Sequence, residues 1–313
     1  MATTPTIPGV TKDDAAPPRR AAAGRSGDRA DSPGEGRILN VFSHGFLVLW
    51  AVMIVLPLIW ILLGAFKTDA EIGASSWSWP SNWNFDAFGR AWTKGHIGSY
   101  FLNTVIVLVF SVPLTMLFGS MGAYVLARYR FTGNRLIYYF FIAGAMFPVY
   151  LGLIPLYFLV KQLGMLNTYQ GLILVYVAYS MPFTVFFMHA FFRTLPTAVH
   201  EAAVIDGASH SRIFFQVMLP MAKPGLISVG IFNLLGQWNQ YILPLVLMQQ
   251  QSGFDKDRSM LTQGLVLLNQ QQGYAGDLPV IFAGMTIAIL PVVVVYLSFQ
   301  RQVQSGLTAG TLK

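Results

Sequence analysis

No residues of this chain have the spacing of a catalytic, nucleotide or metal site. The 313-residue sequence contains no cysteine, which excludes thiol catalysis, thiolate metal ligands and disulfide bonds. It contains no Gly-Lys-Ser or Gly-Lys-Thr, the core of a phosphate-binding loop, and no HExxH or GxSxG motif. The five histidines are scattered, so we expect no metal site. If ATP drives this protein, another polypeptide must bind it, and we do not expect the chain to be an enzyme.

The segment 193–224 carries a more informative pattern of helix signals. Pro196 is suited to a first helical turn, and Gly207 is a natural helix terminator, which together predict a helix of about ten residues. Ser209 can cap a second short helix that ends at Pro220. Two short helices outside a membrane would form either a docking element for a partner or a plain loop on the membrane surface.

The residue types within this segment favour close approach of another surface. Alanines remove bulk from a face of the first helix that also carries an acidic side chain, and Glu201 lies beside it. The predicted face consists of Val199, Ala202, Ala203 and Asp206. The second helix has an apolar stripe at helical spacing, formed by Ile213, Phe214 and Val217.

A second group of polar residues lies in the apolar run 225–248. Asn233, Gln237 and Tyr241 recur at i, i+4 and i+8, with Trp238 and Asn239 adjacent. Amide and hydroxyl groups suit sugar hydroxyls, and an aromatic face suits a pyranose ring, so these five residues are candidates for lining a pathway. The alternative is hydrogen bonding between helices, which also favours Asn and Gln inside a bundle.

The composition identifies the kind of element that must position these residues. The sequence is 54% hydrophobic and only 11% charged, less than half the charge of a typical soluble domain. That apolar content excludes an ordinary soluble enzyme and a nucleic-acid binder. Six runs of at least 22 residues contain no Asp, Glu, Lys or Arg, and about 20 helical residues cross a bilayer core. The runs are 42–66, 100–127, 136–160, 169–192, 225–248 and 278–299.

The sequence therefore predicts an all-α membrane protein with six transmembrane helices. Residues 1–37 are rich in Pro, Ala and Gly and lack apolar periodicity, which predicts a disordered cytoplasmic tail before a transmembrane domain at 38–313. With the N-terminus inside, 14 of the 20 Lys and Arg residues fall in inside segments, a bias that predicts cytoplasmic N- and C-termini. The segment 193–224 is then cytoplasmic.

Two further features of the runs bear on transport. Proton- and ion-coupled carriers place charged groups within their spans, and the absence of such groups here argues against a self-powered carrier and a cation channel. It leaves open a facilitator for neutral solutes. The runs also contain prolines, which either kink the helices or mark broken helices along a transport path. These are Pro57, Pro113, Pro148, Pro155, Pro182, Pro244 and Pro291.

The segment 193–224 resembles the EAA signature of the membrane subunits of ABC importers. Glu201-Ala202-Ala203 is followed by three residues and Gly207, then by nine residues and Val217-Met218-Leu219-Pro220. The surrounding sequence is similar to the carbohydrate-uptake branch, specifically to MalG-like permeases, over about residues 40–313. The supporting pieces are Leu166–Tyr169, Phe192-Arg193 with Leu195-Pro196, Asp206–Ala208, Trp238-Asn239 and Gly306–Gly310. Two departures are Gln240, where the family often has an acidic residue, and Val217, where Ile is usual.

The resemblance implies divided labour in the bacterial plasma membrane. Two similar six-helix permease subunits would form the pathway, two ATPase subunits would bind ATP and Mg²⁺, and an extracytoplasmic binding protein would deliver a sugar. The coupling residues would be Glu201, Ala202, Ala203, Asp206, Gly207, Ala208, Leu219 and Pro220. The loop 249–277 would match the one that reaches into the binding protein in the maltose system, where the partner subunit makes most substrate contacts.

The substrate is expected to be a sugar or oligosaccharide. The Ala-, Arg- and Gly-rich tail hints at a high-GC bacterium and favours an N-acetylglucosamine or chitobiose type of system. The alternatives are a permease subunit for another solute class such as amino acids or metals, a lone facilitator for neutral solutes, and a membrane scaffold or sensor without a transport role.

Overall fold

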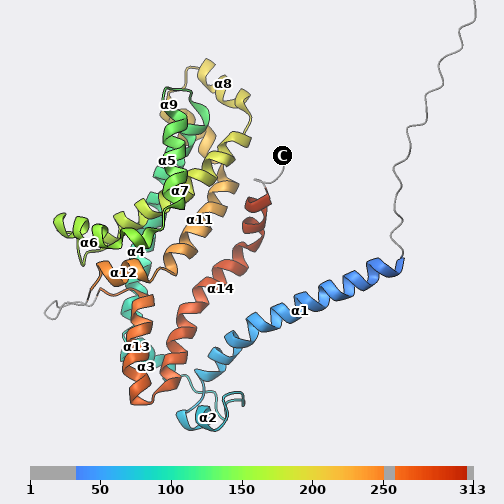
Figure 1. Ribbon diagram of the computed structural model, residues 1–313, viewed down its shortest axis with the longest axis vertical. Coiled ribbons are helices and arrows are strands. Elements are labelled where there is room, and N and C mark those ends of the chain that lie inside the picture. Colours follow the sequence, from blue (N-terminus) through green and yellow to red (C-terminus); the bar gives the residue numbers. More distant parts are fainter. Residues whose placement is uncertain (1–32, 250–257, 309–313) are drawn as a thin grey trace, which may run out of the picture. The chain divides into compact units, whose positions relative to one another are not determined.

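The computed structural model describes residues 33–249 and 258–308 (Figure 1). All regular structure in these residues is helical. The elements are α1 (Pro33–Gly64), α2 (Asp69–Ala74), α3 (Asp86–Thr93), α4 (Ile97–Arg128), α5 (Asn134–Met146), η1 (Val149–Gly152), α6 (Leu153–Gln162), α7 (Tyr169–Thr194), α8 (Thr197–Ile205), α9 (His210–Arg212), η2 (Ile213–Met218), α10 (Leu219–Met221), α11 (Lys223–Trp238), α12 (Ile242–Leu247), α13 (Leu261–Ala275) and α14 (Leu278–Thr308).

The chain divides into two units at Val55, within α1. In the first unit the described residues form the beginning of α1, whose apolar side chains from Val41 onward are exposed. Residues 1–32 of the predicted tail lie outside the described residues, and residues 33–37 belong to α1. This helix begins with Pro33, a residue that the first turn accepts because its missing N–H has no partner there in any helix.

In the second unit, α4 contributes to every hydrophobic cluster. In the first half of α4, Tyr100 and Leu108 pack with α3, α13 and α14, and Val107, on another face, packs with α6, α7 and α12. Near its end, Tyr124 packs with α7 and the segment α8–α11. Its contact with α7 is the most extensive in the fold. The two helices approach closely at Gly119, as shown by the distance of 2.5 Å between an added Cβ there and Thr184 Cγ2.

The long helix α4 defines two opposite ends of this unit. Its 32 residues extend about 48 Å at 1.5 Å per residue. α2, α3 and the beginning of α14 lie near the start of α4, whereas α8 lies near its end (Figure 1). Arg90 of α3 forms an ion pair with Asp277 before α14, with an N–O distance of 3.0 Å, which ties the elements at the start of α4 together.

Four helices are long and apolar enough to cross a membrane, and up to six spans result if each of two bent pairs counts as one. The four are Asn40–Gly64, Ile97–Arg128, Tyr169–Thr194 and Leu278–Gln302. The structure thus confirms the all-helical membrane fold, with the predicted six spans at the upper limit. Pro57, Pro113, Pro182 and Pro291 lie inside continuous helices, so none of these four marks a broken helix.

The predicted third and fifth spans are not single helices. The run 136–160 bends by 90° between Asn134–Met146 and Val149–Gln162. Pro148 lies at this break, because proline lacks the N–H that would continue the helix and disfavours a helical residue before it. The run 225–248 ends its helix at Trp238 and resumes in α12. Asn239 follows Trp238, and both its backbone N–H, at 3.2 Å, and its side-chain amide, at 2.9 Å, donate to the Leu235 carbonyl at the end of this helix.

Candidate functional site

α8 ends in a hydrogen-bonded turn that depends on Gly207. The Ala208 N–H donates to the Ala203 carbonyl and the Gly207 N–H to the Val204 carbonyl, each at 3.0 Å. These two bonds are the Schellman arrangement, which satisfies the last carbonyls of a helix. Gly207 has φ of +73°, the left-handed region in which a Cβ is unfavourable. The sequence prediction of a short helix stopped by Gly207 is confirmed.

The two faces of α8 differ in exposure. Ala203 is half-buried and packs against the cluster of Tyr124 and Phe192, together with Ala208 after the turn. The opposite face is exposed, and Ile205 is 84% exposed. Among the residues the structure describes, the neighbouring Glu201 makes no ion pair. The predicted small-residue face therefore divides between the bundle and the surroundings: Ala203 faces the bundle, and Glu201, Ala202 and Asp206 are exposed.

The second half of the segment returns toward the bundle through a widened helix. The Ser209 side chain accepts the Arg212 N–H and caps α9, as predicted. Ile213 and Phe214 are buried, which confirms the predicted apolar stripe. The helical conformation passes Pro220 and ends at Met221, one residue beyond the predicted end. Because proline cannot donate a backbone bond, the turn before Pro220 opens to π-helical geometry at 213–218, and Leu219 is half-buried beside it.

Residues outside the predicted site hold α8 in place. Arg128, the last residue of α4, donates to the carbonyls of Phe192 at 2.7 Å and Leu195 at 2.6 Å, which caps the end of α7. The Tyr129 hydroxyl lies 2.9 Å from His210 Nδ1. His200 lies with its ring against Tyr129. The sequence carried one signal that could have identified His200. It lies three residues before Ala203, so the two residues share a face of the predicted helix.

His200 is held in an environment that disfavours its charge. Its Nε2 is buried and has no hydrogen-bond partner within the described residues. Burial lowers the pKa of His200 below 6.5, and the nearby Arg128 guanidinium lowers it further, while Glu201 acts in the opposite direction. The imidazole is therefore neutral at pH 7 and packs as an aromatic ring.

The polar residues of α11 join three helices. Asn233 donates to Thr184 Oγ1 of α7 at 2.9 Å, and Gln237 donates to Ser180 Oγ of α7 at 3.0 Å. Gln237 also accepts from Ser111 of α4. Both side chains are buried, which is the interhelical bonding that the sequence left open as an alternative.

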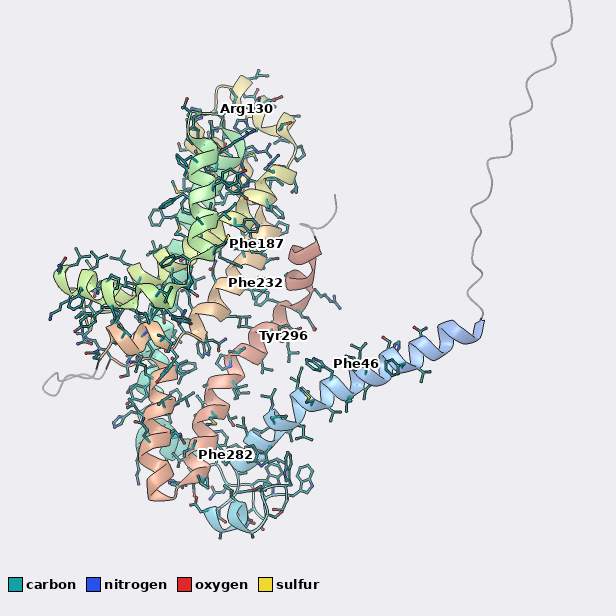
Figure 2. The ribbon with its side chains drawn as sticks, in the orientation of Figure 1. Phe46, Arg130, Phe187, Phe232, Phe282 and Tyr296 are labelled. Atoms are coloured by element: carbon teal, nitrogen blue, oxygen red, sulfur yellow. The ribbon has the colours of Figure 1, made fainter. Side chains whose placement is uncertain are left out.

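Asn233 and Gln237 also line a cavity of about 740 Å³ between the broken helix α5–η1, α7 and α11. Its other walls are largely aromatic, including Tyr179 and Phe183. Figure 2 shows Phe187 and Phe232, two more of its lining residues, close together on α7 and α11. An aromatic wall with a few amide and hydroxyl groups can accommodate a neutral ligand that has both apolar faces and hydroxyls.

The remaining candidates of this group lie elsewhere. Trp238 is buried and donates its indole N–H to the Ala288 carbonyl at 3.2 Å. Asn239 is exposed. Tyr241 lines a different cavity, between α12 and α13. The predicted ladder of Asn233, Gln237 and Tyr241 is thus interrupted by the break after Trp238, and only its first two members share a cavity.

Within the described residues there is no cluster of three or more His, Asp or Glu side chains able to hold a metal ion. The predicted pattern Gly306–Gly310 lies partly outside the described residues, as does the loop 249–277 at residues 250–257.

Residues 115–308 match a family model described as the binding-protein-dependent transport system inner membrane component. The chain is 47% identical over 277 residues to the diacetylchitobiose uptake system permease protein NgcG of Streptomyces coelicolor, covering 88% of this chain and 90% of that protein. It is 32% identical to the melibiose/raffinose/stachyose import permease protein MelC of Bacillus subtilis, covering 82% of this chain and 91% of the relative.

The fold is also similar to a solved structure. A chain of a bacterial ABC transporter involved in the import of the acidic polysaccharide alginate superposes with a TM-score of 0.74 at 24% identity, covering 86% of this chain and 98% of the other. At that identity the likeness concerns the fold.

Proposed function

The chain belongs to the family of binding-protein-dependent transport system inner membrane components, and on this premise we propose that it is a permease subunit of an ATP-driven sugar importer. The observation that carries the proposal is the 47% identity to the NgcG permease over 88% of the chain. Membership places it among transport subunits of the inner membrane rather than among enzymes.

The proposed substrate is a neutral oligosaccharide of the diacetylchitobiose type. Relatives that cover most of the chain are named for the uptake of diacetylchitobiose and of melibiose, raffinose and stachyose. The cavity between α5, α7 and α11 supports this class, because its lining combines aromatic rings with the neutral groups of Ser180, Asn233 and Gln237 and contains no charged side chain. We propose that this cavity faces the pathway, which a second, homologous permease subunit would complete.

The proposed topology puts the α8 end of the bundle in the cytoplasm. Arg128 and Arg130 lie at the end of α4 beside α8, and Figure 2 labels Arg130 there. A concentration of basic residues is typical of cytoplasmic segments. Both chain termini would then be cytoplasmic, and α2, α3 and the loop 249–277 would face the binding protein.

The proposed coupling element is α8 with the turn at Gly207. The exposed face of Glu201, Ala202 and Ile205 has the small and apolar side chains that a cleft on an ATPase subunit can bury, and the Glu201 carboxylate can pair with a basic residue there. Ala203, Ala208 and Leu219 pack against the bundle and would transmit the movement. Pro220 sets the π-helical turn that leads back into α11.

The mechanism we infer divides the work among subunits. ATP and Mg²⁺ would bind to the two ATPase subunits, and closure of these subunits would move α8 as a rigid body with the end of α4 and α7. Arg128 supports this rigid connection because it joins α4 to the end of α7 through two hydrogen bonds. The permease halves would then alternate between inward- and outward-facing arrangements, and the binding protein would release sugar to the outward-facing form.

The test reconstitutes this chain in proteoliposomes with its second permease subunit, its ATPase and its binding protein. N,N′-diacetylchitobiose with the binding protein should stimulate ATP hydrolysis and ATP-dependent uptake, whereas the chain alone should do neither. Uptake by the chain alone down a sugar gradient would instead identify a lone facilitator. Stimulation by amino acids or metal ions but by no sugar would contradict the proposed substrate class.

Glu201→Ala in the same system tests the coupling role. Removing one partner of a partly buried charge pair costs about 2–5 kcal/mol, so stimulated ATPase activity should fall by more than about tenfold while the permease remains in the membrane. Glu35→Ala, which removes an acidic residue from α1, is the control and should keep full stimulation. Unchanged stimulation in Glu201→Ala would show that α8 is a surface loop without a coupling function.

A further inference from the structure

A second cavity, of about 500 Å³, lies between α12 and α13 and is separate from the cavity beside α7. Its polar lining residues are Tyr241, Gln249, Ser259, Gln263 and Gln270, and the others are Leu, Val and Met. It belongs to the end of the unit where α4 begins, since the neighbouring residues of α13 pack there: a Cβ on Gly264 would meet the ring of Tyr100.

Hydrogen bonds fix the shape of this cavity. The Gln263 side chain accepts the Met260 N–H at 2.9 Å and donates to the carbonyls of Pro244 at 3.2 Å and Met248 at 3.1 Å. Thr262 donates to the Gln240 carbonyl at 2.6 Å. Because Gln263 ties the carbonyl of Pro244 in α12 and that of Met248 just after it to α13, the two helices are held together without a ligand.

Three lining side chains are available to a ligand. Tyr241, Gln249 and Gln270 make no side-chain hydrogen bond to another residue in the part of the chain that the structure describes. Gln249 and Gln270 are exposed, and Tyr241 is half-buried. Each primary amide offers two N–H donors and one carbonyl acceptor, and the phenol offers one donor and one acceptor. These groups surround an apolar wall that includes Leu245 and Val266.

The chemistry of this lining differs from that of two other hollows of the unit. The groove between α4, α11 and α14 is lined by apolar side chains around Trp238, which suits a hydrocarbon chain. The hollow beside α2 carries charges, among them Lys67, Glu71 and Arg90. Amides, hydroxyls and an apolar wall without charge select a neutral, polyhydroxylated ligand, whose hydroxyls replace water while its ring carbons cover the Leu and Val side chains.

We propose that the cavity between α12 and α13 is an entrance subsite that binds one sugar unit after release from the binding protein. The proposal rests on the function proposed above and adds a position at which this subunit contacts the substrate. It assigns Gln249 and Gln270 as hydrogen-bonding residues for sugar hydroxyls or acetamido groups, and Tyr241 as the residue that covers one face of the ring.

Cysteine protection tests the subsite directly, because the wild-type chain has no cysteine. In the reconstituted complex, Gln270→Cys should react with a membrane-impermeant methanethiosulfonate reagent from outside. Saturating N,N′-diacetylchitobiose with its binding protein should slow that reaction at least about threefold. Asn269→Cys is the matched control, since Asn269 is the adjacent exposed amide on α13 and does not line the cavity. Equal rates with and without sugar at Gln270→Cys would overturn the proposal.

A second measurement uses the amount of sugar imported per ATP hydrolysed. Loss of one neutral hydrogen bond weakens a site about two- to tenfold, so Gln270→Ala and Gln249→Ala should each lower this ratio by such a factor, while Asn269→Ala leaves it unchanged. Poor assembly would lower the rates of sugar import and of ATP hydrolysis together and leave their ratio unchanged. An unchanged ratio in these variants would therefore contradict the subsite. If sugar stimulates the wild-type complex and these variants have the same ratio as the wild type, the subsite proposal is wrong while the proposed function stands. If the wild-type complex ignores sugar, the proposed function fails.

Discussion

Gly207 illustrates how one residue determines the shape of the proposed coupling element. Space does not require glycine there, because an added Cβ would meet no atom within 4 Å. The requirement comes from the backbone, whose φ of +73° costs an L-residue about 1–2 kcal/mol. Replacement therefore changes the conformational free energy of the turn without filling a contact.

Gly207→Ala should loosen the turn that ends α8. At a cost of about 1–2 kcal/mol, exchange of the Ala208 amide hydrogen should accelerate by roughly five- to thirtyfold, measured by hydrogen–deuterium exchange on the complex. Gly207→Asn should have a smaller effect, because Asn tolerates the left-handed region. Gly89→Ala in α3, where a Cβ also meets open space, is the control and should leave exchange in α3 equal or slower. Equal exchange in all three variants would contradict the turn geometry.

His200 makes the packing of α8 sensitive to acid. The pKa of His200 is lower in the folded protein than its ordinary value of 6.5, which applies to the unfolded chain. At pH values between the lowered pKa and 6.5, the folded state therefore binds fewer protons than the unfolded state. By linkage, the stability contributed by the neutral ring is complete above pH 6.5 and is lost as the pH falls through the lowered pKa. Arg128, Glu201 and His210 are the charged or titratable groups that act on its pKa, and Tyr124 and Tyr129 pack against its ring.

Lowering the pH from 7.5 to 5.5 should therefore increase the opening of α8, seen as hydrogen exchange corrected for the intrinsic pH effect. His200→Phe keeps the ring contacts with Tyr124 and Tyr129 and removes the titration, so it should abolish the pH dependence. His210→Gln separates the neighbouring histidine, and it should leave most of the dependence in place. The same dependence in His200→Phe as in wild type would assign the effect to another group.

At the scale of elements, α11 is held to α4 and α7 by polar side chains. Gln237 bonds to Ser111 of α4 and Ser180 of α7, and Asn233 bonds to Thr184. Interhelical hydrogen bonds in membrane proteins contribute about 0.6 kcal/mol on average and up to about 1.7 kcal/mol. The same two α11 residues line a cavity, so their structural and ligand-binding roles must be separated by experiment.

A double-mutant cycle of Ser111→Ala and Gln237→Ala should give a coupling free energy of about 0.6–1.7 kcal/mol in denaturant unfolding of the solubilised complex. Ser111 is buried and is not part of the cavity lining, so Ser111→Ala alone should keep sugar uptake near the wild-type rate. The control cycle pairs Ser111→Ala with Asn239→Ala and should be additive, because among the described residues the Asn239 side chain bonds to the nearby Leu235 carbonyl and not to another helix. Additivity in both cycles would show that the hydrogen bond between Ser111 and Gln237 does not stabilise the packing of α11 against α4.

At the scale of the whole molecule, the decisive prediction concerns which end of α4 faces the cytoplasm. α8 lies at one end of α4 and the segment α2–α3 at the other, separated by about 48 Å of helix. In the proposed topology a cysteine introduced at Ser209 should react only from the cytoplasmic side and one at Ser78 only from outside. Both side chains are exposed. Labelling of both from one side would refute the proposed arrangement of spans.

The sequence by itself was sufficient for the fold class and for the family. Six charge-free apolar runs have one stable solution in a bilayer, the α-helix, because the bilayer core offers no water for unpaired backbone groups. The position of α8 was equally local, since Pro196, Gly207 and Ser209 act on the backbone next to them. Such signals need no distant partner, and the structure confirms them.

Only the tertiary structure decided where long apolar runs break and which polar residues meet. Pro148 breaks its run by 90°, whereas Pro113, Pro182 and Pro291 do not break theirs, because neighbouring helices determine whether a freed backbone group is satisfied. The break after Trp238 moves Tyr241 into a different cavity from Asn233 and Gln237, although the spacing of all three is helical. Arg128 bonds to carbonyls 64 and 67 residues away. Periodicity describes one helix at a time, and these contacts depend on how several helices pack.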